Sequence, residues 1–338
     1  MWKFFTCLVV ASIFGGCAQT TGPVSESLDT PELDWGETTL PEPESITRPV
    51  REVAELPAAV VKIQFESQKS EGSGFVVHPR GYILTNMHVV EGEDEVLVSF
   101  DKGGEKYRAK VISRNQCDDL ALLQLQTPPA ENLPYLTTHR QGLNLGDEVT
   151  LLGFPQGTAD ITLSQGVVSK TQDQHVEAVT GLERVFETDG FLGSGSSGGP
   201  VVNEKLEIVG VSVAHAGGKQ SVIPWSTVAR SLPQMFKERF VHGWGFLATG
   251  EDGEFVVQEI VQGSPAEELG LRPADEILEV EGVALSEQPA QQFCRTVREN
   301  NSRDTPEVRV KRQNQLLVGQ LRRRPLEYIR QISTRFWP

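Results

Sequence analysis

The chain has 338 residues, which is enough for two average folded domains with additional segments at the ends. Its 38% hydrophobic residues and 32 glycines are typical of a globular protein with many turns. The formal net charge of -15 argues against a nucleic-acid partner, because contacts to phosphates need a basic surface. Residues 295–338 are the exception, with eleven Lys and Arg against four acids. A solvated charged end is the simpler interpretation of this segment, in preference to a site for an anionic partner.

The first residues have the pattern of an export signal. One lysine precedes a short apolar run from Phe4 to Phe14, which is too short to span a bilayer comfortably and ends in small residues. Cys17 directly follows two glycines, and this order resembles a bacterial lipoprotein signal, which is cut before the cysteine and lipidated there. Phe14 stands where such signals usually have leucine, so an ordinary signal peptide with an incidental cysteine stays an alternative. The lipoprotein interpretation predicts an exported protein of the bacterial periplasm, anchored to the outer membrane through Cys17.

An acidic spacer is expected over residues 17–57. From residue 18 to residue 57 the chain contains nine acids, two arginines and six prolines. Such a composition cannot bury enough apolar surface to fold alone. We therefore expect a semi-extended tether between the signal and the first domain.

Short β-runs separated by turn residues begin near Ala58. Apolar runs lie at residues 59–65, 74–77, 82–86 and 96–100, with glycine and asparagine between them. Many short strands with such turns predict a β-barrel or β-sandwich and not a βαβ fold. This region, residues 58–232, is the first predicted domain.

Two polar residues at the ends of apolar runs in this domain are candidates for acid–base chemistry. His88 closes the run 83–87, and its imidazole titrates near neutral pH, as a general base must. Asp119 begins the run 120–123 and could orient a histidine. Taken alone, each residue has a simpler explanation. His88 could be a hydrogen-bonded core histidine, and Asp119 could be a solvated acid at the start of a strand. Asp118 is the competing carboxylate.

The segment GSGSSGGP at residues 193–200 is the strongest candidate for a nucleophile. A reactive serine needs a backbone that exposes its hydroxyl and aims amide groups at an oxyanion, and glycines permit this geometry. A flexible linker would have the same composition, but apolar runs at 201–202 and 208–211 follow directly. The chain order His88, Asp119, Ser197 is the order in the chymotrypsin triad.

These segments together resemble the HtrA (Deg) family of serine proteases. The resemblance is carried by GSGF at 72–75, LTNMHVV at 84–90, DLA at 119–121, GFPQG at 153–157 and GSSGGP at 195–200. It implies a chymotrypsin-like double β-barrel in a mainly β chain. It implies Ser197 as nucleophile, His88 as general base and acid, Asp119 as the orienting carboxylate, and the amides of Gly195 and Ser197 as the oxyanion hole. The family usually has asparagine where Ser196 stands, which leaves the resting conformation of this loop open.

Phe191 is the candidate for the specificity pocket. In trypsin-like folds the residue six before the serine lies near the pocket floor, and Phe191 holds that position. Without an acid there, cleavage after Arg or Lys is not expected. The family implies a small apolar residue before the cleaved bond, and a phenylalanine floor agrees with this.

A second domain is predicted over residues 243–325, with a C-terminal tail at 326–338. A helical stretch at 226–240 precedes it. GWGF at 243–246 and GSPAEELGL at 263–271 resemble the PDZ domain that follows the protease domain in HtrA proteins, and the second motif predicts a capped helix that ends at Gly270. Ala274 stands where the family commonly has glycine, so we expect the turn there to use another conformation.

The PDZ resemblance implies binding of peptide C-termini by strand addition. Trp244, Gly245 and Phe246 are the candidate cradle for the terminal carboxylate. An edge turn with two core aromatics is the alternative. The helix flanking the groove is expected at 288–299.

Four cysteines are too few for a disulfide framework in a chain of this length. Cys117 and Cys294 fall in different predicted domains. Pairing between them is open, and free, partly buried thiols are the simpler expectation.

The sequence thus predicts an envelope serine endopeptidase that degrades misfolded or exposed polypeptides. No metal or organic cofactor is implied, because no clustered His and Cys ligands occur. The expected partners are unfolded protein substrates, peptide C-termini at the PDZ domain and a membrane reached through the lipid anchor. HtrA relatives are commonly trimers, so a homotrimer is compatible with the resemblance, although no residue feature indicates it. The alternative is a lipid-anchored binding or chaperone protein that keeps the fold with a non-productive site.

Overall fold

A computed structural model of the chain describes most of the two predicted domains. The described residues are 49–65, 71–100, 104–127, 133–139, 142–156, 158–173, 182, 185–214, 220–241, 243–249, 253–286, 288–299, 306–321 and 324–331. The predicted signal at 1–16, Cys17 and the spacer up to residue 48 lie outside them.

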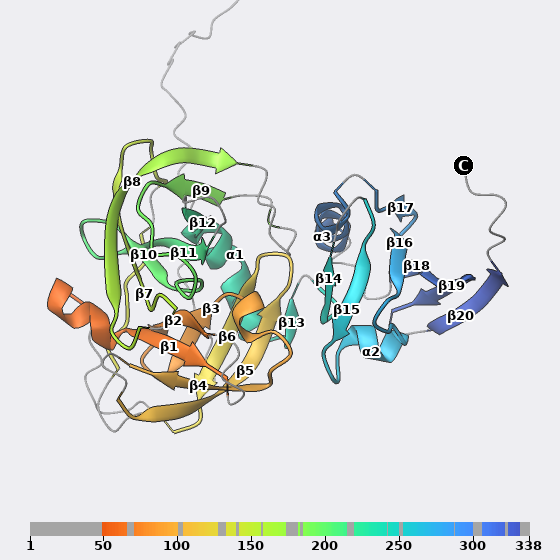
Figure 1. Ribbon diagram of the computed structural model, residues 1–338, viewed down its shortest axis with the longest axis horizontal. Helices are drawn as coiled ribbons and strands as arrows, with labels where there is room; N and C mark the ends of the chain where they lie inside the picture. Colours follow the sequence, from red (N-terminus) through yellow and green to blue (C-terminus); the bar gives the residue numbers. More distant parts are fainter. Residues whose placement is uncertain are drawn as a thin grey trace, which may run out of the picture. The chain divides into compact units, whose positions relative to one another are not determined.

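The first barrel has the strand order β5, β4, β1, β2, β3, β6, and it is closed because β5 and β6 also pair with each other. Its strands are β1 (Val60–Gln64), β2 (Glu71–His78), β3 (Tyr82–Thr85), β4 (Glu95–Ser99), β5 (Lys106–Asn115) and β6 (Leu120–Leu125). Their inward side chains are Val, Ile, Leu and Ala, which are almost completely buried. β-branched residues suit such pleated, packed surfaces. Figure 1 shows this barrel in orange and yellow.

The second barrel is closed in the order β10, β11, β12, β9, β8, β7. Its strands are β7 (Glu148–Gly153), β8 (Thr162–Asp173), β9 (Val185–Thr188), β10 (Pro200–Val202), β11 (Ile208–Ala214) and β12 (Gln220–Pro224). One cluster of buried side chains includes residues from both barrels, among them Phe75 of β2 and Val202 of β10. The double β-barrel that the sequence predicted is therefore confirmed (Figure 1).

Both ends of the first domain differ from the prediction. The segment before residue 58 is not all spacer, because η1 (Val53–Ala58) places Leu56 in the core, and Pro49 forms a β-bridge with Tyr135. The predicted helix at 226–240 is shorter, since α1 covers Trp225–Met235. After it, β13 (Phe240–Val241) pairs in parallel with β5, so the end of the predicted helix is a strand.

The PDZ domain forms one sheet in the order β14, β15, β16, β18, β19, β20, with β17 beside β16. Its elements are β14 (Phe246–Thr249), β15 (Val256–Ile260), α2 (Pro265–Leu269), β16 (Glu276–Val280), β17 (Val283–Ala284), α3 (Pro289–Glu299), β18 (Glu307–Arg312), β19 (Gln315–Gln320) and β20 (Arg324–Gln331). Strand β14 is at the edge of this sheet. The last strand extends to residue 331, so the first residues assigned to a tail belong to the sheet.

The capped helix that the sequence predicted is confirmed. The Ser264 side chain accepts a hydrogen bond from the amide of Glu267, and Gly270 ends α2 in the left-handed conformation at φ 86°. The helix predicted at 288–299 is confirmed as α3, which covers Pro289–Glu299.

The expectation for Ala274 is wrong. Ala274 keeps a left-handed backbone at φ 69°, the region that glycine would occupy without steric cost. The Ala274 amide donates to the carbonyl of Val257, and the neighbouring Asp275 is buried in contacts of its own. These contacts outweigh the strain of about 1–2 kcal/mol that a left-handed alanine carries.

Cys117 and Cys294 are not free thiols. They form a disulfide with a Cα–Cα distance of 5.3 Å, which links the turn between β5 and β6 to α3. The expectation of unpaired cysteines is therefore wrong. Spacing could not decide the question, because the two residues are 177 positions apart.

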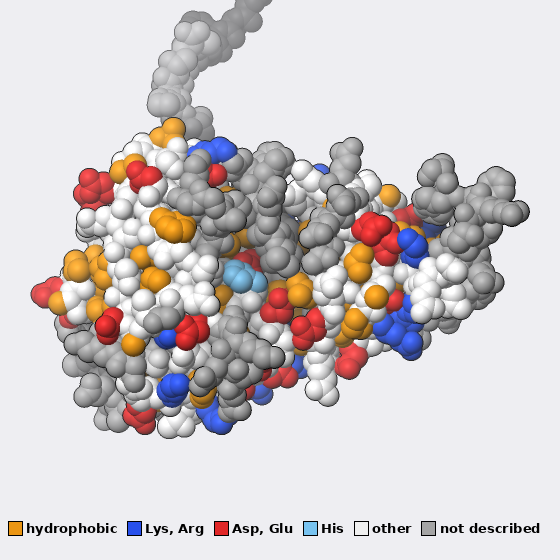
Figure 2. Space-filling model, in the orientation of Figure 1, with side chains coloured by type: hydrophobic (Ala, Val, Ile, Leu, Met, Phe, Trp, Pro, Cys, Tyr) orange, Lys and Arg blue, Asp and Glu red, His pale blue; other side chains and the backbone are white. Residues whose placement is uncertain are grey.

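No helix among the described residues is long and apolar enough to cross a bilayer. On the face shown in Figure 2, acidic and basic side chains are interspersed over the described surface of both domains.

A buried ion pair gives a test of the PDZ core. Asp275 is 1% exposed and receives two hydrogen bonds from Arg312, at 2.7 and 2.8 Å. Changing Arg312→Met should destabilise the PDZ domain by about 3–5 kcal/mol, because the carboxylate loses its cation in a dry site. Calorimetric melting of the full chain measures this.

The matched control is Arg309→Met on the same strand. Arg309 is 47% exposed and pairs with Glu279 at 3.1 Å, so this change should cost less than about 1 kcal/mol. Equal losses in the two variants would contradict a specific role of the buried pair.

Candidate functional site

The first barrel provides a histidine–carboxylate pair. His88 follows β3 at the start of η2 (His88–Val90), and Asp119 precedes β6. His88 Nδ1 lies 2.8 Å from Asp119 Oδ2, and the backbone amide of His88 donates to Asp119 Oδ1 at 3.0 Å. The β3–β6 pairing brings the two strand ends together, since Thr85 pairs with Ala121. Asp119, and not Asp118, therefore makes the contact with His88.

Asp119 adopts an unusual backbone conformation. Its φ is 49°, and its side chain is completely buried. The Asp119 carbonyl accepts hydrogen bonds from the side chain of Asn86 at 3.0 Å and from the amide of Met87 at 3.1 Å. A non-glycine residue stays in this region only where its surroundings hold it there. Sequence patterns contain no signal for this strain.

The environment of His88 raises its pKa above 6.5. Burial acts in the opposite direction, but the charge of Asp119 and the hydrogen bond to it outweigh the cost of desolvation, and Glu91 adds to the effect. The His88 side chain is 33% exposed, so solvent and substrate reach the far side of the ring. A neutral imidazole in this setting is a strong acceptor for a proton.

The turn at residues 193–199 carries Ser197 from the second barrel. Three of its glycines, Gly193, Gly195 and Gly198, have positive φ values of 79°, 89° and 85°. A Cβ on Gly198 would lie 2.2 Å from the carbonyl oxygen of Ser73 and from the hydroxyl of Thr85, so only glycine fits there. The close approach places the turn against β2 and β3, next to the end of the strand that His88 follows.

The Gly195 amide makes no hydrogen bond to any described residue, whereas the Gly195 carbonyl accepts one from Ser73 Oγ at 2.8 Å. This leaves the amide available to an incoming oxyanion. Ser197 itself is 7% exposed. The predicted Gly195 and Ser197 thus lie in one glycine-stabilised turn.

Ser73 is a positioning residue that the sequence motif contained but did not single out. It lies on β2 of the first barrel and is completely buried. Its hydroxyl accepts a hydrogen bond from the amide of Phe154, and its amide donates to the Ser197 carbonyl at 2.8 Å. Together with its bond to Gly195, Ser73 joins the nucleophile turn and the end of β7 to the first barrel.

Phe191 is not the closed pocket floor that the sequence predicted. Its side chain is 43% exposed, while Thr188 and Gly190 before it are buried. The backbone after β9 alternates inward and outward, and Gly190 packs closely against Leu151, so the next side chain points outward. The ring lies beside Gly193 in the nucleophile turn.

The side chains of the predicted carboxylate cradle are core residues. Trp244 and Phe246 are 2% and 1% exposed, and each makes an edge-on contact with Phe293 of α3, with ring centroids 5.1 and 5.3 Å apart. Gly245 has φ 75°. The alternative of an edge turn with two core aromatics describes these side chains. In the backbone of this turn, the carbonyls of Trp244 and Gly245 accept hydrogen bonds from the amides of Ala266 and Val261.

Among the described residues, no group of three His, Cys, Asp or Glu side chains could hold a metal ion.

Glu91 is a titratable neighbour that sequence reasoning missed. Burial raises its pKa from 4.5 to about 7, and the negative charges of Asp119 and Glu259 add to the shift. His88 opposes it. Nothing in the sequence around Glu91 indicates that its carboxyl group is buried.

Two domain families match the chain. Residues 72–211 match a trypsin-like peptidase domain, and residues 256–312 match a PDZ domain. The chain therefore contains a trypsin-like peptidase domain followed by a PDZ domain, as predicted.

Several curated proteins are similar to this chain. A probable periplasmic serine endoprotease, DegP-like, of Chlamydia trachomatis is 32% identical over 62% of this chain and 46% of that protein. The putative serine protease HhoB of Synechocystis is 31% identical over 64% of this chain and 58% of that protein. Serine endoprotease DegS of Haemophilus influenzae is 27% identical over 64% of this chain and 67% of that protein. The chain spans about half the length of the first two.

A solved structure shows the likeness of fold. The serine endoprotease from Yersinia pestis superposes with a TM-score of 0.50 at 24% sequence identity, covering 82% of this chain and 97% of that chain. At this level of identity, the likeness shows the fold alone.

Ser73 gives a test of the contact between the barrels. Changing Ser73→Ala leaves the Phe154 amide and the Gly195 carbonyl unpaired in a dry site, which should cost about 1–3 kcal/mol of stability. Because Gly195 is then free to turn, the rate of covalent labelling at Ser197 should also fall. Melting temperature and labelling rate with a serine-directed fluorophosphonate measure the two effects.

The matched control is Ser113→Ala. Ser113 is equally buried, and its hydroxyl donates to the Glu238 carbonyl away from the nucleophile turn. It should lose stability without losing labelling rate. If the Ser73 variant is labelled as fast as the Ser113 variant, Ser73 does not position the turn that carries Ser197.

Glu91 gives a pH-dependent test. Its folded-state pKa of about 7 exceeds the unfolded value of 4.5, so the unfolded chain ionises first as the pH rises. Stability is therefore lost between about pH 4.5 and 7, by on the order of 1–3 kcal/mol. Glu91→Gln should melt like the parent at pH 4 and at a higher temperature at pH 8.

Glu93→Gln, two residues along the same turn, is the charge-matched control for this comparison. Identical melting of the Glu91 variant and the parent at pH 8 would show that Glu91 is ionised without cost.

Proposed function

We propose that this chain is a serine endopeptidase of the HtrA type that cleaves misfolded or exposed polypeptides in the bacterial periplasm. The contact of 2.8 Å between His88 and the buried Asp119, next to the glycine turn that carries Ser197, supports the proposal most directly. The trypsin-like and PDZ domain matches and the names of the relatives agree with it.

In the proposed reaction, Ser197 Oγ attacks the peptide carbonyl while His88 Nε2 takes the hydroxyl proton. Asp119 holds the Nδ1–H tautomer and stabilises the imidazolium. The amides of Gly195 and Ser197 donate to the negative oxygen of the tetrahedral intermediate. His88 then gives the proton to the leaving amine, which leaves an ester on Ser197. Water, activated by the same histidine, hydrolyses that ester and regenerates the serine.

We propose an apolar side chain before the cleaved bond. Phe191 is exposed beside the nucleophile turn and offers an apolar contact, and no acid stands at its position to attract Arg or Lys. Its exposure favours a shallow surface contact over a deep pocket.

We propose that the PDZ domain recruits peptide C-termini by strand addition. Strand β14 lies at the edge of its sheet, and α3 packs on the same aromatic core through Phe293. The backbone of residues 244–246 precedes and starts this strand, where it would receive the terminal carboxylate.

The export signal, lipidation at Cys17, anchoring to the outer membrane and a homotrimeric state belong to the proposal. The acidic, proline-rich composition of residues 18–57 supports a tether of this kind. Relatives named periplasmic agree with export.

The alternative of a binding protein with a non-productive site is not favoured. Burying a carboxylate in a strained backbone costs free energy. Asp119 uses this position to pair with His88, which is the arrangement a catalytic site needs.

Covalent labelling tests the activity. The parent chain should react with a fluorophosphonate probe and cleave unfolded casein, and both should vanish in Ser197→Ala. Asp119→Asn should fold normally but lose about 10⁴-fold in kcat, as expected when the histidine is held in the wrong tautomer.

A folded parent chain that neither labels nor cleaves, even with added C-terminal peptides, would contradict the peptidase proposal. It would favour the binding protein instead.

A further inference from the structure

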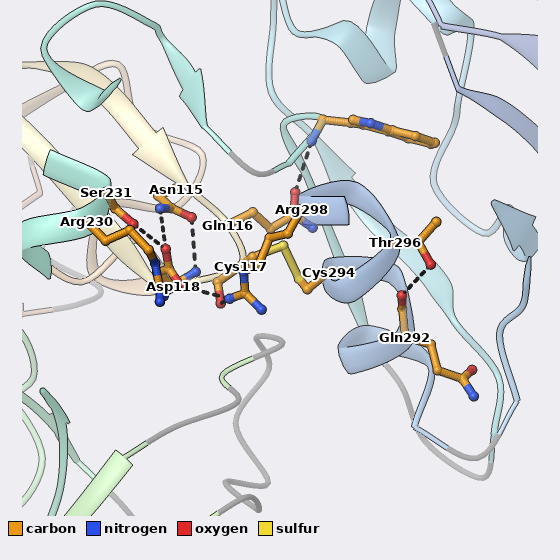
Figure 3. Close-up of a disulfide and its surroundings, with 11 residues drawn as sticks. Asn115, Gln116, Cys117, Asp118, Arg230, Ser231, Gln292, Cys294, Thr296 and Arg298 are labelled. Carbon is orange, nitrogen blue, oxygen red and sulfur yellow. Dashed lines mark hydrogen bonds and ion pairs between the residues drawn. A yellow bond between two sulfur atoms is a disulfide. The ribbon is translucent and has the colours of Figure 1, made fainter. Parts of the chain in front are cut away.

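The turn that carries Asp119 is bound to the PDZ domain through helix α3. Cys117 is joined to Cys294 by the disulfide, and Arg298, one helical turn further on, reaches the same turn. Arg298 Nη2 lies 2.9 Å from the carbonyl oxygen of Cys117 and 2.7 Å from Asp118 Oδ1. Figure 3 shows both side chains of α3 directed at this one turn. Two consecutive residues before Asp119 are therefore held by the second domain.

The contact is dry and continuous with the PDZ core. Cys117 is completely buried within the hydrophobic cluster that contains Trp244, Phe293 and Cys294. The side-chain oxygen of Gln116 accepts a hydrogen bond from the Trp244 amide at 3.4 Å. Both sulfurs are almost inaccessible, at 0% and 1% exposure, so an external thiolate has little access and the bridge is a structural link.

Arg298 is the cation in hydrogen-bond contact with the buried Asp118 carboxylate. Its carboxylate is buried and also accepts hydrogen bonds from Asn115 at 2.7 Å and Ser231 at 2.5 Å. A second cation, Arg230, is 3.8 Å away on a side chain that is 57% exposed. Removing the cation in direct hydrogen-bond contact with a buried carboxylate favours a rearrangement that brings the carboxylate to water.

Such a rearrangement would act directly on Asp119. Its left-handed backbone is strained and persists only while its neighbours hold it. Its own polar groups are held by Asn86, Met87 and His88. On its C-terminal side it is held by β6, and on its N-terminal side by the contacts of residues 117 and 118. Movement of the 118–119 peptide would turn the Asp119 carboxylate away from His88.

We propose that Arg298, together with the Cys117–Cys294 disulfide, positions the catalytic aspartate, so that the PDZ domain completes the protease active site. The inference rests on the proposed peptidase function.

The first test compares Arg298→Gln, Arg298→Lys and Arg295→Gln in the full chain. Arg295 is an exposed residue of the same helix and gives the same loss of charge. Arg298→Gln should lower kcat by about 10²-fold, the size expected when a catalytic group moves by about 1 Å, with KM for labelled casein within twofold of the parent. Arg298→Lys replaces the guanidinium with a single ammonium that keeps the positive charge, so its kcat should lie between those of Arg298→Gln and the parent. Arg295→Gln should match the parent.

The pH profile separates positioning from a general loss of stability. Loosening Asp119 removes the charge and hydrogen bond that raise the His88 pKa, so the acid limb of kcat/KM should move to lower pH in Arg298→Gln. Glu91, the other acid whose charge raises the His88 pKa, is unchanged in this variant. A merely destabilised but correctly arranged site would keep the parent profile.

A readout without turnover keeps the proposal testable if the activity fails. In a Ser197→Ala background, the downfield proton resonance of the His88–Asp119 hydrogen bond should be present with Arg298 and lost or broadened in Arg298→Gln. Cys294→Ala, which cuts the covalent link alone, should broaden it too and serves if Arg298→Gln does not fold. An unchanged resonance in the folded variants, or unchanged kcat and acid limb, would overturn the proposal. A parent chain without turnover but with the resonance would count against the peptidase function alone.

Discussion

The active site depends on the hydrogen bonds of one buried serine between two barrels. Ser73 belongs to the first barrel, yet its hydroxyl and amide bind the carbonyls of Gly195 and Ser197 in the turn of the second. Without this contact, the shared core would still join the barrels, but the turn at residues 193–199 would lose its hydrogen bonds to Ser73 of the first barrel. The small side chain matters as much as its hydrogen bonds, because the glycines around it allow the two backbones to approach closely.

Asp119 shows how local strain and tertiary contacts balance at this site. Its left-handed backbone is unfavourable alone, and its carboxylate is costly to bury unless it is paired. His88 satisfies both carboxylate oxygens, and Asn86 with Met87 satisfies the carbonyl. The same turn continues into the disulfide and Arg298 contacts of the PDZ domain. Asp119, which we propose orients the catalytic base, is thus supported by both domains.

Particular elements show why some sequence interpretations succeeded. The capped α2 was predictable, because Ser264, Pro265 and Gly270 act on their immediate neighbours. The prediction made helix α1 too long, to residue 240. Residues 240–241 instead pair with β5, which is far away in the sequence, and a local pattern cannot indicate such a contact. Ala274 kept the conformation of a glycine because long-range contacts outweighed a modest local strain. The side chain of Phe191 points outward because Gly190 packs inward against Leu151, and neighbouring residues of an extended segment face opposite sides.

The sequence by itself determined the domain order, the β character of the first domain, and His88 and Ser197 as two of the residues proposed as the triad. These follow from local periodicity, from glycines that permit unusual backbone geometry, and from motifs read over a few residues. Only the tertiary structure decided that Asp119 and not Asp118 faces His88, that Ser73 joins the barrels, and that Cys117 pairs with Cys294. The physical reason is that these contacts join residues that are 31, 122 and 177 positions apart, where chain connectivity places no limit on which groups meet.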